Sequence, residues 1–336
     1  MKEAMFYNSL KNNVVQCYLC PHFCAVKPGF RGKCGVRENI EGKLFSLNYG
    51  KIISMAVDPV EKKPFFHFLP KTFSYSIAAV GCNLFCEFCQ NWEISQQPKP
   101  NNPIIGNNVT PEEIVESAIA NGCKSISYTY TEPTIFFEYA YETAKLAKKK
   151  GLKNCFVTNG FITPEPIIKI ARYLDAANVD LKGFSEDYYK NVCGARLKPI
   201  LEAIKQYYKS KVFLEITTLI VPGHNDSNDM LTKIAEFIAS VDRKIPWHIS
   251  RFYPHYKMQN VPETDIETMH MAVKIGKEVG LKYVYAGNVP GDNYESTYCP
   301  KCGKKIIERE GFYVSKINLK NDKCAFCSEK IDLIAE

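Results

Sequence analysis

The sequence lacks the features of a membrane or exported protein. Its 336 residues contain no uninterrupted run of about 18 apolar side chains, the length that a transmembrane helix needs. No apolar stretch follows the charged start of the chain, where Lys2 and Glu3 lie, so we expect no secretory leader. We therefore predict a protein with no membrane partner.

Strong charge of one sign is missing as well. The net charge is +7, which allows an anionic ligand but does not by itself indicate a nucleic-acid partner. The sequence also has no internal repeat, no low-complexity linker and no evident catalytic triad or carboxylate pair. These absences exclude a repeat architecture and direct attention to the one residue type that is unusually frequent.

That residue is cysteine, with 14 in the chain. Without an export signal, disulfides are a poor explanation because the cytosol keeps thiols reduced, and metal or redox chemistry is the better one. We expect a cytoplasmic, oxygen-poor setting. Eleven cysteines form three groups: Cys17, Cys20, Cys24 and Cys34; Cys82, Cys86 and Cys89; and Cys299, Cys302, Cys324 and Cys327. The other three, Cys123, Cys155 and Cys193, are expected to be small buried apolar side chains.

Between the outer cysteine groups, predicted strands and helices alternate. Strands are predicted at 73–80, 125–130, 154–157, 177–181, 212–219, 247–252 and 283–286. Helices are predicted from Thr110, with Pro111 first, at 134–150, from Thr163, and at 196–208, 228–240 and 263–279. This alternation predicts an α/β fold with a parallel sheet, either doubly wound or a barrel, whose ligands bind at the carboxyl ends of the strands.

The central cysteine group has the spacing Cys-x3-Cys-x2-Cys and directly follows the first predicted strand. Three thiolates suit an iron–sulfur cluster with one open iron, whereas a structural zinc site needs a fourth ligand nearby. The motif resembles the signature of the radical S-adenosylmethionine (SAM) superfamily. The resemblance implies a [4Fe–4S] cluster at Cys82, Cys86 and Cys89 whose open iron chelates SAM. Electron transfer to SAM then yields a 5′-deoxyadenosyl radical that abstracts hydrogen from a substrate.

Polar residues at the ends of the later strands resemble the SAM site of pyruvate formate-lyase activating enzymes. The resemblance implies that Glu132 binds the amino group of SAM and that Lys182 reaches its carboxylate. The full set of implied SAM contacts is Thr131, Glu132, Thr158, Asn159, Asp180, Lys182, Thr217 and His255. His248 and Arg251 compete with His255, and Val157 stands where the activating enzyme has an aspartate.

The outer groups predict two further metal sites. Cys299, Cys302, Cys324 and Cys327 form paired Cys-x2-Cys knuckles, which are typical of a zinc ribbon. Residues 299–336 carry eight Lys/Arg against six Asp/Glu, a balance that argues against a nucleic-acid footprint. Cys17, Cys20, Cys24 and Cys34 fit zinc or a second [4Fe–4S] cluster equally well.

From about residue 2 to 330, the chain resembles the radical SAM proteins of the AmmeMemoRadiSam system. The resembling segments start at Cys17, Gly32, Asp58, Gly81 and Tyr285. The resemblance implies a partial (β/α)6 radical SAM barrel at 71–290, an N-terminal Cys-rich metal-binding segment at 1–70 and a zinc-ribbon-like module at 291–336. It also implies a radical SAM oxidoreductase related to glycyl-radical enzyme activases. A reduced flavodoxin or ferredoxin would be the electron donor, and a protein would be one kind of substrate.

Two alternatives stay open at this point. A radical SAM enzyme could instead modify a small molecule or RNA, in which case it would enclose its substrate or bind phosphates. A non-catalytic zinc-ribbon binding protein would hold zinc alone and have no affinity for SAM. The unpaired three-cysteine motif on a strand-to-helix loop argues against this second alternative.

Overall fold

The computed structural model of the protein describes residues 1–98, 102–289 and 291–335, and its centre is a nine-stranded sheet. The strand order is β15-β14-β13-β12-β11-β10-β8-β7-β9. The strands are β7 (Lys51–Pro59), β8 (Phe73–Ala79), β9 (Asn107–Asn108), β10 (Ser125–Tyr128), β11 (Lys153–Thr158), β12 (Ala176–Asp180), β13 (Phe213–Ile220), β14 (Trp247–Arg251) and β15 (Val284–Gly287). β8 and β10 to β15 are parallel, whereas β7 is antiparallel to both β8 and β9.

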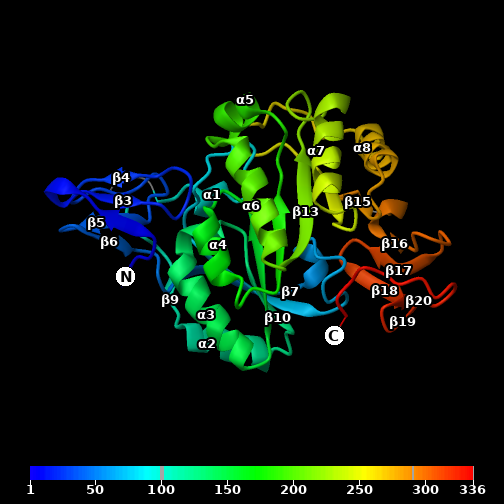
Figure 1. Cartoon of the computed structure of the whole chain (residues 1–336), viewed down its shortest axis with the longest axis horizontal. Coiled ribbons are helices and arrows are strands. Elements are labelled where there is room, and N and C mark those ends of the chain that lie inside the picture. The colour runs from blue at the N-terminus through cyan, green and yellow to red at the C-terminus, as the bar shows by residue number, and fades with distance from the viewer. Residues whose placement is uncertain (99–101, 290, 336) are drawn as a thin grey trace.

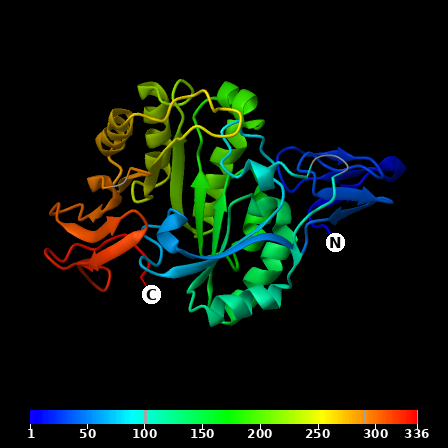
Figure 2. The ribbon, with the colours of Figure 1, turned by 180° about the vertical axis from the view of Figure 1, so that it is seen from behind.

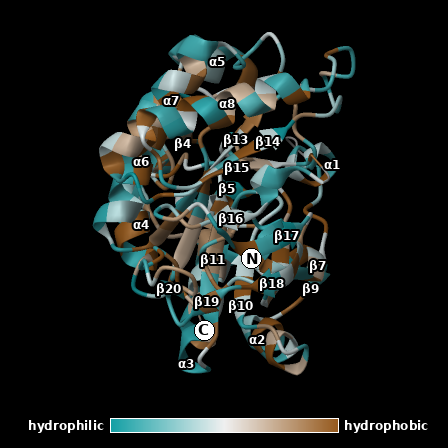
Figure 3. Ribbon diagram, turned by 90° about the vertical axis from the view of Figure 1, so that its right-hand side faces the viewer, coloured by the Kyte–Doolittle hydropathy of each residue, from teal (hydrophilic) through white to brown (hydrophobic). Residues whose placement is uncertain are grey.

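Helices cover the outer face of this curved sheet (Figure 1). The helices that do so are α2 (Pro111–Ala120), α3 (Phe137–Lys149), α4 (Pro164–Ile170), α6 (Leu197–Lys209), α7 (Asn228–Val241) and α8 (Ile266–Val279). Two short helices, α1 (Trp92–Ser95) and α5 (Glu186–Tyr188), lie near the carboxyl ends of the strands instead. Hydrophilic and hydrophobic residues lie on different faces of the long helices (Figure 3), as expected for helices that pack one side onto a sheet. The expected α/β fold with a partial barrel is confirmed.

Local chemistry sets where the elements begin and end. α2 begins as predicted, because the Thr110 hydroxyl accepts the Glu113 N–H and the Glu113 carboxylate accepts the Thr110 N–H. The strand predicted at 125–130 ends earlier, at Tyr128. Tyr130 has a φ of 63°, a left-handed conformation that cannot continue a strand.

Residues 60–70 fold back into the barrel and form its floor. The carboxylate of Glu215, on β13, accepts the backbone N–H groups of Phe66 and His67 at 3.0 and 2.9 Å. The side-chain amide of Asn178 donates to the carbonyl of Pro64 at 2.7 Å. A buried carboxylate and a buried amide inside the barrel therefore hydrogen-bond backbone groups of this segment that no neighbouring strand reaches.

Two small β modules flank the barrel on opposite sides (Figures 1 and 2). The N-terminal module contains β1 (Lys2–Glu3), β2 (Tyr7–Ser9), β3 (Val15–Cys17), β4 (Ala25–Val26), β5 (Arg37–Ile40) and β6 (Lys43–Ser46). The C-terminal module contains β16 (Thr297–Tyr298), β17 (Lys305–Glu310), β18 (Tyr313–Ile317), β19 (Leu319–Lys320) and β20 (Lys323–Cys324). The domain boundaries predicted at 70 and 290 stay predictions, although β7 already belongs to the central sheet. No helix in the described part of the chain is long and apolar enough to cross a membrane.

Candidate radical SAM site

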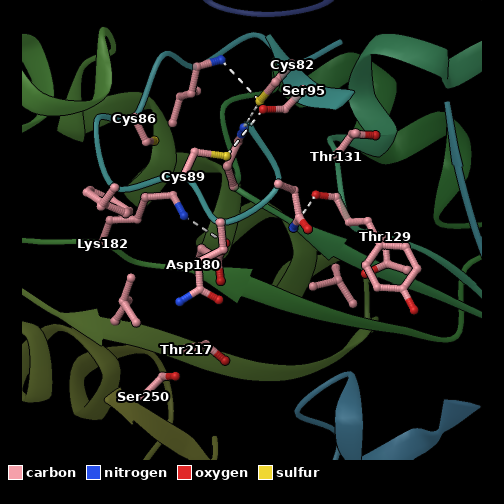
Figure 4. Close-up of a pocket in the computed structure, with 18 of the residues that line it drawn as sticks. Cys82, Cys86, Cys89, Ser95, Thr129, Thr131, Asp180, Lys182, Thr217 and Ser250 are labelled. Atoms are coloured by element: carbon pink, nitrogen blue, oxygen red, sulfur yellow. Dashed lines mark hydrogen bonds and ion pairs between the residues drawn. The ribbon is translucent and has the colours of Figure 1, made fainter. Parts of the chain in front are cut away.

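The central cysteines lie on the loop that follows β8. Gly81 starts this loop with a φ of +107°, a backbone conformation that favours glycine. A Cβ at this position would also lie only 2.9 Å from Val36 Cγ1, so there is no space for a larger residue. Cys82, Cys86 and Cys89 all line one cavity of about 280 Å³ at the carboxyl ends of the strands. Figure 4 shows the cysteines at one end of this cavity and Thr217 and Ser250 at the other.

The three sulfur atoms do not all lie within 4.8 Å of one another. Among the residues that the structure describes, only the C-terminal cysteines bring three or more ligand atoms within 4.8 Å of one another. Backbone N–H of Leu84 and the side-chain amide of Asn159 donate to Cys82 Sγ at 3.4 and 3.5 Å. This spacing favours a multinuclear cluster over one zinc ion.

Cys86 is a thiol with a depressed pKa. A hydrogen bond with the Cys193 side chain lowers its pKa, and the positive charge of Lys182 lowers it further, against the effect of burial. Cys193 is itself fully buried, as predicted, but its contact with Cys86 was not foreseen. Thiolates are the form that binds iron, so this environment suits a cluster ligand.

Asp180 and Lys182 extend into the cavity from the end of β12. Lys182 Nζ lies 2.8 Å from Asp180 Oδ2. Burial by itself would lower the pKa of Lys182, but the charges of Asp180 and Cys86 hold it well above its usual value. Lys182 therefore remains a cation that can bind a carboxylate.

Glu132 is fully buried and is engaged with its own neighbours. Its Oε1 accepts hydrogen bonds from Thr134 N–H, Thr134 Oγ1 and Thr158 Oγ1 at 3.0, 2.5 and 2.7 Å. Its Oε2 accepts the backbone N–H of Asn159 at 2.8 Å. Burial raises the pKa of Glu132, and these hydrogen bonds partly offset the rise. The carboxylate thus joins the ends of β10 and β11 and fixes the turn that carries Asn159.

The structure brings most, but not all, of the predicted SAM contacts to the cavity. Among the predicted SAM contacts, five line the cavity: Thr131, Asn159, Asp180, Lys182 and Thr217. Glu132 and Thr158 lie behind this wall, hydrogen-bonded to each other, and His255 is exposed and is not part of the cavity lining. The SAM contacts stay predictions, and for Glu132 the geometry supports a positioning role. The competitor His248 pairs with Glu215 at 2.6 Å in the barrel floor.

Sequence reasoning missed a basic and aromatic part of the wall. Lys62, Lys63 and Tyr130 all line the cavity. Lys63 Nζ lies 2.8 Å from Asp58 Oδ2 and 4.0 Å from the centre of the Tyr130 ring, while the Tyr130 hydroxyl donates to Asp58. Burial lowers the pKa of Lys63 to about 8. The Asp58–Pro64 segment was a visible motif, but nothing in the sequence indicated that its chain folds back to the cavity.

Comparisons with known proteins agree with this geometry. The family model of the radical SAM superfamily matches residues 76–238, which include the three central cysteines. An uncharacterized protein of Methanocaldococcus jannaschii, MJ0808, is 49% identical over 337 residues, which cover 99% of this chain and 100% of the relative. The chain belongs to the radical SAM superfamily. For this family a [4Fe–4S] cluster and SAM are expected, and the three-cysteine cavity fits both.

Other relatives link this radical SAM protein to activating enzymes. The pyruvate formate-lyase 1-activating enzyme of Escherichia coli is 24% identical over 61% of this chain and 89% of its own length. A putative glycyl-radical enzyme activating enzyme of M. jannaschii is 30% identical over 52% of this chain and 71% of its own. A radical SAM methyltransferase from Sphaerobacter thermophilus shares the fold alone, with a TM-score of 0.50, 14% identity and coverage of 64% and 67% of the two chains. The narrower assignment to AmmeMemoRadiSam proteins stays a prediction.

The C-terminal cysteines of this radical SAM protein form a compact metal-binding centre. Their Sγ atoms all lie within 4.8 Å of one another, with Cys299–Cys327 at 3.6 Å and Cys302–Cys324 at 3.8 Å. A tetrahedral zinc ion with sulfur ligands at about 2.3 Å has sulfur–sulfur distances of about 3.8 Å. The geometry therefore fits one tetrahedral ion, as the predicted zinc ribbon requires.

The N-terminal cysteines also converge. Cys17, Cys20, Cys24 and Cys34 line a second, smaller cavity of about 20 Å³. His22 and Arg37 complete part of its wall. The four cysteines thus line one cavity, and the metal site predicted for them stays a prediction.

Proposed function

We infer that this protein is a radical SAM oxidoreductase that cleaves SAM reductively to abstract hydrogen from its substrate. In this proposal Cys82, Cys86 and Cys89 hold a [4Fe–4S] cluster, which supplies the electron that converts SAM to a 5′-deoxyadenosyl radical. The observation that carries the proposal is the convergence of these three cysteines with Asn159, Lys182 and their neighbours on one cavity.

The residues of the cavity would divide the binding of SAM between them. Lys182 supplies a positive charge for the carboxylate of SAM, and Asp180 keeps that charge in place through the 2.8 Å ion pair. Asn159 contacts Cys82 Sγ and can position the methionyl group beside the cluster. Thr217, at the far end of the cavity, is a hydroxyl for the nucleoside part. Glu132 would act indirectly, by holding the Asn159 turn.

The substrate proposal follows the activating-enzyme relatives. We infer an activase-like reaction in which hydrogen is taken from a protein partner, with reduced flavodoxin or ferredoxin as the electron donor. Two named relatives are activating enzymes, which supports this proposal over a small-molecule or RNA substrate. Zinc is proposed for the C-terminal centre, and zinc or a second [4Fe–4S] cluster for the N-terminal one.

The test is low-temperature EPR of anaerobically reconstituted, dithionite-reduced protein with and without SAM. We expect a [4Fe–4S]⁺ signal that changes when SAM is added. Cys86→Ala should remove the SAM-sensitive signal, whereas Cys123→Ala, a matched change at another buried cysteine, should keep it. A reconstituted wild-type protein that carries only zinc and no SAM-sensitive signal would contradict the proposal.

A further inference from the structure

The sulfur atoms of the N-terminal cysteines are not gathered as they are around a zinc ion. They line a cavity of about 20 Å³, which is enough for about one water molecule. Four sulfur atoms at about 2.3 Å from one zinc ion would leave no space for a water-sized sphere between them. No three of these sulfur atoms lie within 4.8 Å of one another, in contrast to the C-terminal centre of the same described chain.

The environment of Arg37 indicates that this cavity holds a ligand. Arg37 lines the cavity and is 2% exposed. Its guanidinium donates to Cys17 Sγ at 3.3 Å and pairs with the buried carboxylate of Glu138. Its Nε, however, has no acceptor among the residues that the structure describes. A buried charged donor without a partner is costly, and the sulfides and thiolates of a cluster would supply acceptors.

The N-terminal site also touches the loop that carries the central cysteines. Gly81 is packed so closely that a Cβ there would lie 3.3 Å from the carbonyl oxygen of Cys34. His22 Nε2 lies 2.7 Å from the carbonyl oxygen of Asn83, the residue next to Cys82. The segment that carries the N-terminal cysteines is therefore in direct contact with the loop that carries the central ones.

We propose that Cys17, Cys20, Cys24 and Cys34 hold a [4Fe–4S] cluster that passes electrons to the central cluster. A one-electron iron–sulfur or flavin protein reduces the N-terminal cluster from the 2+ to the 1+ state and is itself oxidised by one electron. The N-terminal cluster returns to 2+ when it reduces the central cluster to 1+. No proton moves in either step. The metal assignment is independent of the proposed function, and only the relay rests on it.

The metal assignment is tested in a full-length variant that lacks the central ligands, Cys82→Ala/Cys86→Ala/Cys89→Ala. After anaerobic reconstitution we expect about four iron and four acid-labile sulfide atoms per chain. Adding Cys34→Ala should abolish them, whereas adding Cys123→Ala should not. Zinc in place of iron, or no iron at all, would overturn the assignment. Wild-type protein gives a second reading that needs no variant, because two clusters require about eight iron atoms per chain and one cluster about four.

The relay is tested by the reduction kinetics of the central cluster in wild type and in Cys34→Ala. With reduced ferredoxin as the donor, the variant should lose the fast appearance of the SAM-sensitive EPR signal. With Ti(III) citrate, a small reductant that needs no protein contact, the signal should still appear and shows that the variant is folded. Equal rates with ferredoxin in both proteins would refute the relay while leaving the metal assignment intact. Loss of the SAM-sensitive signal from the wild type would instead refute the proposed function.

Discussion

Replacing Glu132 by glutamine separates its positioning role from direct binding of SAM. Three of its four hydrogen bonds are accepted by Oε1, so the glutamine oxygen should take that side. The new NH2 group then faces the backbone N–H of Asn159, which is 2.8 Å from Oε2 in the native chain. The hydrogen bond from the Asn159 N–H to a charged group is lost. This N–H and the two N–H donors of the new amide are then without an acceptor among these partners, a combined loss of about 3 kcal/mol.

The assay is thermal unfolding of the anaerobic holoprotein, combined with a SAM titration of the EPR signal. At about 2 °C per kcal/mol for a chain of this size, Glu132→Gln should lower Tm by about 6 °C. The affinity for SAM should weaken as well, because the turn that carries Asn159 loses its anchor. Glu116→Gln, the same change at an exposed position, should alter neither. An unchanged Tm together with lost SAM binding would refute this reasoning, because it would mean that the carboxylate turns into the cavity and binds SAM itself.

Further predictions concern a buried lysine, a buried cysteine and the C-terminal metal-binding centre. Burial lowers the pKa of Lys63 from 10.5 to about 8, so between these two pH values the unfolded chain binds more protons than the folded chain. The free energy of unfolding should therefore rise with pH from about 8 to 10.5. In urea unfolding, Lys63→Met should lack this rise. Cys193→Ala should leave the central iron content unchanged, because Cys193 contacts Cys86 without lining the cavity, and iron loss on gel filtration would make it a fourth ligand. Cys302→Ser should release one metal ion per chain and lower Tm, as metal analysis and calorimetry would show, while the SAM-sensitive signal persists.

The sequence was sufficient to predict the parts of the site that depend on strand order. Asn159 follows β11 and Asp180 ends the neighbouring strand β12. The carboxyl ends of parallel strands meet at one edge of a sheet, so the proximity of these two residues could be predicted. The orientation of each side chain could not. Glu132 follows β10 in the expected place, yet two threonines and one backbone N–H take up its oxygens, and those partners become visible only in three dimensions.

Contacts between distant segments account for the rest of what was missed. Lys63 reaches the cavity because β7, which precedes it, pairs antiparallel with β8. The residue pattern of a strand does not show which neighbour it pairs with or in which direction. In the sequence Cys193 is an isolated apolar residue, and only the π-helical turn Tyr189–Cys193 that follows α5 brings it to Cys86. Likewise, the sequence spacing of the N-terminal cysteines is compatible with either a zinc ion or an iron–sulfur cluster. These two occupants differ in the distances between the sulfur atoms that bind them, and those distances are known only from the folded structure.

The floor of the barrel implies an order of events during synthesis on the ribosome. Residues 66–69 emerge early, but the backbone of His67 and Leu69 hydrogen-bonds to the backbone of Ile334 near the other end of the chain. The Phe66 carbonyl accepts a hydrogen bond from Arg309. We therefore expect the floor of the nascent barrel to lack these contacts until the C-terminal module has been made and has docked. We expect a ribosome-released fragment ending before Arg309 to expose the apolar residues of this floor, and a holding chaperone to bind it.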